Sequence, residues 1–464
     1  MKHNLLIKIR YCSRLVQFAG LNSSLFLVLL ILLSLLEACR QQPDDMVQPV
    51  TSNGKTADQY SADVATQWSA LQLKLAQTTA GNTPPVVSRA LGYAGLTLYE
   101  AIVPGLPTHR SLAGQLNGLT ALPTPQANQE YNWSLSANAA EATIVRGLWA
   151  NTSDANKKTI DSLETALLTN VGKGLSVDVV TRSVNFGKSI GDAVFAYSKT
   201  DGGHEAYTRN FPASYVVPTG AGLWLPTSTQ LTPMLPTWGQ NRSFVTANAT
   251  TDAQEPITYS ALTNSPFFGQ AMEVYTTGKN LTADQKEIAL FWADDAGKTF
   301  TPPGHGVSIA TQLLQKEKAT LAQAAEILAK IGMATTDAFI ACWRCKYRFN
   351  VIRPVSFINQ AIDPLWQPLL ATPPFPEHTS GHSSGSGAAA LILEDHFGPN
   401  YSFTDHSHDT RGFIARSFKS FREYSEEAAL SRLYGGIHYR HANEQGLING
   451  RRIAQNVLAL GWKK

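Results

Sequence analysis

The chain has 464 residues, of which 43% are hydrophobic, 16% charged and 9% aromatic. This composition is typical of a globular protein and excludes a disordered or collagen-like chain. Lysine and arginine total 38 against 35 aspartates and glutamates, a balance too even for the basic surface that binds nucleic acid. We therefore expect no nucleic-acid partner.

The first forty residues have the pattern of an export signal. A basic stretch precedes an apolar run at 25–36, which is too short to cross a membrane comfortably as a helix and predicts a signal peptide over residues 1–38. The end of this segment resembles a bacterial lipobox, with Glu37 in place of the usual small residue and Cys39 as the lipidated position. We expect an exported protein, periplasmic or on the cell surface, whose only membrane contact is this lipid anchor. Residues 39–58 are predicted to be a polar tether.

Helical periodicity dominates the rest of the chain, and very few stretches alternate with period two. After residue 38 the chain has 426 residues, more than one compact core usually holds. The sequence predicts an all-α fold of two packed helical bundles, residues 59–262 and residues 263–464, the second carrying the functional site. The expected helical segments are 68–75, 87–102, 133–150, 154–172, 176–199, 283–296, 305–316, 319–345, 383–397 and 441–460.

A proline-rich stretch at about 203–262 interrupts this helical pattern. A loop of this length inside a compact domain is usually functional or disordered. We expect an irregular covering loop between the two bundles, packed by its aromatic residues, which include Trp224 and Trp238. Further along, Cys342 and Cys345 form a single Cys-x-x-Cys pair, a poor zinc site that predicts either a local disulfide or two buried thiols.

Three segments of the second half combine cations, glycines and histidines. In the first, Lys346 and Arg353 are seven residues apart, so on one continuous helix they would project from nearly the same face until Pro354 ends it. Read alone, this segment is equally compatible with a solvated basic stripe.

The second segment places Ser380, Gly381 and His382 immediately before a predicted helix. The unpaired N–H groups of a helix start, together with the positive end of its dipole, make an anion site. The third segment combines Arg432, a glycine pair and His438. Together the three segments offer the cations, N–H groups and imidazoles that neutralise an oxyanion away from water.

At this point the chain resembles the superfamily of type 2 phosphatidic acid phosphatases and vanadium-dependent haloperoxidases. Its three-part signature is Lys-x6-Arg-Pro, Pro-Ser-Gly-His and Ser-Arg-x5-His-x3-Asp. Here these are found, in order, as 346–354, 379–382 and 431–438. The contexts of Trp343 and Phe375 and the Phe-Trp-Ala-Asp run at 291–294 resemble the soluble haloperoxidase branch.

The resemblance implies a vanadate cofactor, with hydrogen peroxide and a halide as substrates. His438 would bind the vanadium, and the vanadate oxygens would be held by Lys346, Arg353, Ser380, Gly381 and Arg432. His382 would move the proton as general acid–base. Lys346 would also polarise bound peroxide, and Asp294 would pair with the arginines.

Two positions depart from the signature. Thr379 replaces its proline, and Ala442 stands where the family has the aspartate that orients the histidine matching His438. Another group must then orient His438, and a backbone carbonyl, Asn443 and Glu444 are the candidates.

Other functions fit the same residues. Phosphate has the shape and charge of vanadate, so the chain could be a soluble acid phosphatase in which His438 forms a phosphohistidine. It could also be a lipoprotein that binds an oxyanion without turnover, given the missing aspartate. A zinc hydrolase is a remoter alternative, because zinc sites seldom coexist with three converging cations. The histidine pairs that suggest it are His378 with His382, His406 with His408, and His438 with His441.

Overall fold

The computed structural model describes residues 54–464. The predictions for a signal peptide and for Cys39 therefore lie outside the described residues. The described chain is helical except for one antiparallel pair of short strands, β1 (Phe403–Asp405) and β2 (Arg416–Phe418), which confirms the all-α prediction. Within residues 54–464, no helix has both the length and the apolar character that a membrane span requires.

The helices mostly begin where the periodicity predicts them. Those of the first half are α3 (Asp63–Thr78), α4 (Pro84–Ile102), α5 (Trp133–Leu148), α6 (Asp154–Gly172) and α7 (Val177–Ser198). Those of the second half are α8 (Pro266–Lys279), α9 (Ala283–Phe291), α10 (Thr301–Lys316), α11 (Leu321–Phe349), α12 (Pro354–Ala361), α13 (Gly381–Phe397), α14 (Phe421–Tyr434) and α15 (Arg440–Leu458).

Helices α8, α12 and α14 were not predicted. Helix α12 has only 8 residues, too few for a periodic pattern. In α14, charged residues occupy much of the surface, so its apolar stripe is narrow. In contrast, α9 and α11 begin with complete capping boxes at Thr282 and Thr320, which satisfy the free N–H groups of the first turn.

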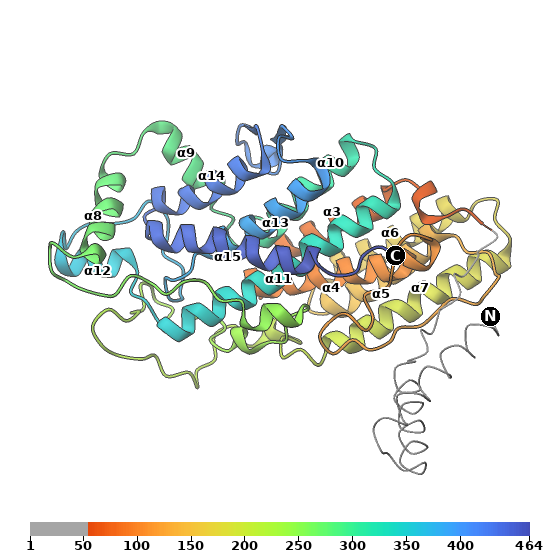
Figure 1. Ribbon diagram of the computed structural model, residues 1–464, viewed down its shortest axis with the longest axis horizontal. Coiled ribbons are helices and arrows are strands. Elements are labelled where there is room, and N and C mark those ends of the chain that lie inside the picture. Colours follow the sequence, from red (N-terminus) through yellow and green to blue (C-terminus); the bar gives the residue numbers. More distant parts are fainter. Residues whose placement is uncertain (1–53) are drawn as a thin grey trace, which may run out of the picture. The chain divides into compact units, whose positions relative to one another are not determined.

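Helix α11 is the central element of the fold. It is 29 residues long and buried around most of its circumference, and it runs through the middle of the molecule between α4 and α13 (Figure 1). One apolar core extends over helices from both halves of the chain, from Val87 on α4 to Ile453 on α15. The division into bundles at residues 262 and 263 stays a prediction.

Residues 199–265 form the expected irregular covering loop, with only short 3-10 turns. Trp224 and Trp238 are buried in it, as predicted. The loop is tied to the second half of the chain, because the Trp224 N–H donates to the Asn350 carbonyl at 2.7 Å and the Met234 N–H to the Pro374 carbonyl at 2.9 Å. Below the loop, Cys342 and Cys345 are two buried free thiols.

The contact of α11 with α4 requires glycine. A Cβ on Gly332 would lie 2.6 Å from the Leu91 carbonyl oxygen and 2.9 Å from the Gly92 Cα, so we expect Gly332→Ala to destabilise the protein by about 1–3 kcal/mol. Gly269→Ala on α8 is the control, because its added Cβ meets no atom within 4 Å and alanine favours helix by about 0.5–1 kcal/mol. Urea unfolding measures both. Equal stabilities of the two variants would contradict the proposed close contact.

Candidate active site

The first two predicted cations are held by separate elements. Helix α11 ends at Phe349, and Asn350 follows with a left-handed φ of 47°, a conformation that asparagine tolerates. Arg353 is the N-cap of α12, and Pro354 begins that helix instead of ending α11. The prediction that both cations share one helix face is therefore wrong. Both side chains are nevertheless fully buried, and both reach the segment 375–379.

The Lys346 ammonium is held entirely by backbone carbonyls. Its Nζ donates to the carbonyl oxygens of Pro376 at 3.0 Å, Glu377 at 3.0 Å and Thr379 at 2.5 Å. An ammonium has three protons, so all three are engaged. Burial lowers the pKa of Lys346 to about 8. Lys346 could polarise another oxygen only by releasing one of these carbonyls.

The two arginines are anchored in the same way. Arg353 donates through Nε to the Phe375 carbonyl at 2.9 Å and through Nη1 to the Ile437 carbonyl at 2.7 Å. Arg432 donates through Nη1 to the Trp292 carbonyl at 2.8 Å. Burial lowers the pKa of each to about 10, so both remain charged at neutral pH. No carboxylate forms an ion pair with any of the three cations among residues 54–464.

Helix α13 supplies the predicted anion-binding turn. Ser380 is its N-cap, and the Ser380 Oγ accepts from the Ser383 N–H at 3.3 Å. Gly381 and His382 are the first two helical residues, whose N–H groups have no partner within a helix. Burial, and then the charge of Arg432, lowers the pKa of His382 well below its usual value, while the nearby Asp294 and the carbonyls of Trp292 and Ala293 oppose this.

The His438 ring is held from both sides. Its Nδ1 lies 2.8 Å from the Glu377 Oε1, and its Nε2 lies 3.2 Å from the Arg353 Nη1. Burial lowers the pKa of His438 well below its usual value, and so do the charges of Arg353, Lys346 and Arg432. The ring is therefore neutral at pH 7.

Glu377 was missed by the sequence analysis. None of the groups considered there holds His438: Glu444 is exposed, and the Asn443 Oδ1 accepts from the Ser383 Oγ at 3.5 Å. Glu377 precedes His438 by 61 residues, so no local spacing could have identified it. Burial raises the pKa of Glu377 to about 7, whereas the charges of Arg353 and Lys346 oppose that rise.

Several buried polar side-chain atoms of this region have no hydrogen-bond partner among residues 54–464. They belong to the three predicted segments, and an unpaired buried donor is costly unless a ligand or water satisfies it. The Arg353 Nη1 lies 3.2 Å from the His438 Nε2, and the charge of Arg432 also acts on that ring. The unpartnered atoms are Arg353 Nη2, Arg432 Nε, His382 Nε2 and Thr379 Oγ1. This arrangement suits a small oxyanion with several negatively charged oxygens.

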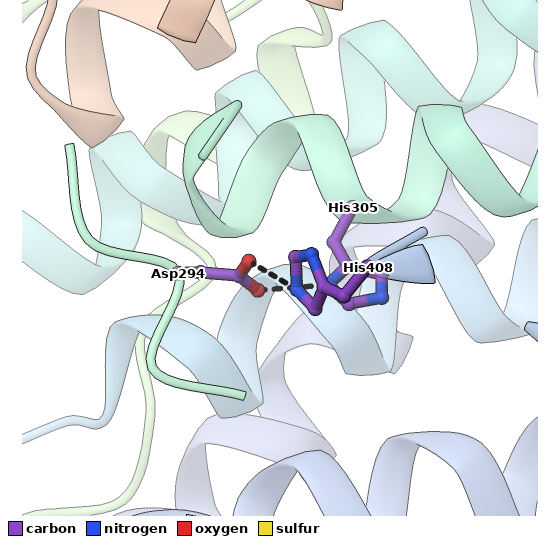
Figure 2. A group of neighbouring side chains, drawn as sticks. All are labelled: Asp294, His305 and His408. Carbon is purple, nitrogen blue, oxygen red and sulfur yellow. Dashed lines mark hydrogen bonds and ion pairs between the residues drawn. The ribbon is translucent and has the colours of Figure 1, made fainter. Parts of the chain in front are cut away.

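Asp294 does not pair with the arginines, so that prediction is wrong. Its backbone is left-handed, with a φ of 46°, and its carboxylate faces two histidines (Figure 2). Asp294 Oδ2 lies 2.7 Å from His305 Nδ1, and Asp294 Oδ1 lies 3.1 Å from His408 Nε2. His408 is 1% exposed.

These residues form a closed hydrogen-bonded group with Asp405, whose Oδ2 lies 2.7 Å from His305 Nε2. Because carboxylates only accept, His305 carries a proton on each nitrogen and is an imidazolium between two aspartates. One possible metal-ligand atom from each of Asp294, His305 and His408 lies within 4.8 Å of the other two, which is close enough for all three to hold a metal ion. The 2.7 Å contacts on both sides of His305 are hydrogen-bond lengths, so one imidazolium bridges two carboxylates here.

Comparison with known proteins places this site in context. The family model for the VCPO second helical-bundle domain matches residues 326–461. This range contains all the residues predicted to hold the oxyanion. The vanadium chloroperoxidase of Curvularia inaequalis is 24% identical over a region that covers 34% of this chain and 36% of that protein. The chain thus spans about a third of the length of this curated relative.

Solved structures match over nearly their whole length. A bacterial vanadium-dependent iodoperoxidase is 34% identical, with a TM-score of 0.76, and the match covers 86% of this chain and 96% of that one. A bacterial vanadium-dependent chloroperoxidase is 16% identical with a TM-score of 0.61, covering 86% of this chain and 95% of that one. The second similarity is one of fold.

The His305 cluster predicts a specific pH dependence of stability. Although burial lowers it, the charges of Asp294 and Asp405 raise the pKa of His305 to about 10, above the value of about 6.5 in an unfolded chain. The stabilisation is therefore complete below about pH 6.5 and is lost as the pH rises through about 10. We expect His305→Gln to cost about 3–5 kcal/mol at pH 6 and progressively less toward pH 10, measured by urea unfolding.

The control is His406→Gln. His406 is 2.9 Å from Asp409 in an ion pair that is more than half exposed, so its loss should cost at most about 1 kcal/mol. Equal losses in the two variants, or a His305→Gln cost that does not change with pH, would contradict a buried imidazolium at position 305.

Proposed function

Because this chain belongs to the vanadium-dependent haloperoxidases, we propose that it binds vanadate and oxidises a halide ion with hydrogen peroxide. The observation that carries the proposal is the set of buried polar atoms without a partner among residues 54–464, on Arg353, Arg432, His382 and Thr379, with Arg353 3.2 Å from the His438 Nε2. Three cations without carboxylate partners favour a ligand with more than one negative charge.

The residues present suit vanadate. We assign the vanadium contact to His438 Nε2, and the contacts to its oxygens to Arg353, Arg432, Ser380 and the Gly381 N–H. When bound, vanadate supplies the Lewis-acidic centre that activates peroxide. Lys346 contributes positive charge and holds segment 376–379 in place through its three carbonyl contacts.

His382 is the proposed proton carrier. Its Nε2 is buried without a partner, and its lowered pKa leaves the ring neutral at pH 7. A neutral imidazole can accept a proton from a peroxide and return it to a leaving oxygen. Arg353 and Arg432 keep their charge throughout, so they neutralise oxygens without exchanging protons.

We propose iodide as the preferred halide, since the relative with 34% identity is an iodoperoxidase and iodide is the halide that loses electrons most readily. Hydrogen peroxide and the halide would reach the site past the covering loop of residues 199–265, where Met234 contacts the chain beside Phe375.

The test uses the purified protein after dialysis against EDTA. With vanadate, peroxide and iodide we expect triiodide to form, and without vanadate we expect none. His438→Ala should lose the activity and retain no vanadium by elemental analysis. His441→Ala, whose ring donates to the Glu255 carbonyl at 2.9 Å, is the matched control and should keep both.

Two outcomes would contradict the proposal. One is stoichiometric vanadium in His438→Ala, which would exclude the assigned ligand. The other is release of phosphate from a phosphomonoester without vanadate, together with no iodide oxidation, which would make the chain a phosphatase.

We also propose that the chain is exported and lipid-anchored at Cys39, which rests on the N-terminal sequence alone. In bacteria that express the full chain, a radiolabelled fatty acid should be incorporated into the wild-type protein and not into Cys39→Ala. Label in both proteins, or in neither, would contradict the anchor.

A further inference from the structure

The position expected to carry the orienting carboxylate holds a methyl group. Ala442 lies in the first turn of α15 and is 1% exposed. Its carbonyl accepts from the Ser380 N–H at 3.2 Å, which ties α15 to the anion-binding turn. Its side chain has no polar atom, so it cannot hold the ring of His438.

The contacts of His438 determine which nitrogen carries the proton. The guanidinium of Arg353 has donors only, so the His438 Nε2, 3.2 Å from Nη1, must accept. In a neutral ring the proton is then on Nδ1 and is donated to the Glu377 Oε1 at 2.8 Å. This tautomer leaves Nε2 without a proton, so its lone pair faces the Arg353 guanidinium and is able to bind a ligand.

Glu377 is itself fixed by contacts with two of the three motif segments that build the site. Its backbone N–H donates to the Val351 carbonyl at 3.0 Å, and its own carbonyl accepts from the Lys346 Nζ at 3.0 Å. Its Oε1 also accepts from the Tyr439 N–H at 3.0 Å, and the side chain is 2% exposed. A carboxylate held this firmly sets the rotation of the His438 ring.

We propose that Glu377 is the carboxylate that positions the His438 ring in this enzyme. It does from another segment of the chain what an acid at position 442 would otherwise do. The proposal rests on the proposed function, because it concerns how the assigned vanadium ligand is held. Groups of this kind fix the tautomer of a ligating histidine and raise its basicity, and their loss typically costs about 10–100-fold in affinity. The vanadate itself would contact His438 and not Glu377.

The main experiment compares vanadate binding by calorimetry in four metal-free proteins. We expect Glu377→Gln to bind vanadate about 10–100-fold more weakly than the wild type. The double variant Glu377→Gln/Ala442→Asp places an acid at position 442 instead. It should bind vanadate at least tenfold more tightly than Glu377→Gln does. Glu444→Gln removes an exposed acid two positions beyond Ala442 and should bind as the wild type does.

A second measurement does not depend on vanadate. In protein labelled with 15N-histidine, the His438 ring, identified by its absence in His438→Gln, should show a proton on Nδ1 in the wild type and in the double variant. In Glu377→Gln only the 3.2 Å contact of the Arg353 Nη1 still disfavours a proton on Nε2, so part of the population should carry the proton on Nε2. Because the readout is made on the apoprotein, it decides the role of Glu377 even if the wild type fails to bind vanadate, an outcome that would overturn the proposed function instead.

Unchanged vanadate affinity and an unchanged tautomer in Glu377→Gln would overturn the role of Glu377. So would a loss of vanadate affinity in Glu377→Gln with an unchanged His438 tautomer, because a purely structural acid would give that result.

Discussion

The site depends on three buried cations whose hydrogen bonds go to neutral groups and not to carboxylates. Lys346, Arg353 and Arg432 donate to backbone carbonyls, which offer a dipole and no net charge. Burying such charges is expensive, and their lowered pKa values express that cost. The positive charge therefore remains available, and a bound oxyanion would relieve it. A ligand that binds only the folded chain also stabilises it.

The carboxylates near the site are kept from cancelling this charge. Glu377 is committed to His438 and Tyr439, and Asp294 is turned toward His305 and His408. The imidazolium of His305 lies between Asp294 and Asp405, so these two acids share one cation that is not part of the anion site. The field of Asp294 still reaches Arg432 and His382, but neither of its carboxylate oxygens competes for the arginine protons.

Much of the fold and part of the site could be predicted from the sequence. Helical periodicity located α3 to α7, α9 to α11, α13 and α15, and it missed α8, the short α12 and the charged α14. The signature residues were found because each motif is local in the chain. The hydrogen-bond partners of the site residues could not be found in this way, because they are distant in the chain. Glu377 lies 61 residues before His438, and His408 lies 114 residues after Asp294.

The sequence by itself determined which side chains could carry the chemistry: three cations, a helix start and two histidines, with an alanine where an acid was expected. Only the tertiary structure decided how these groups are used. It engaged all three protons of Lys346, placed Arg353 at the start of a new helix, and set Glu377 against His438. The physical reason is that hydrogen bonds and burial depend on distance in space, and segments of the site up to 140 residues apart in the chain meet only when the shared core around α11 has formed.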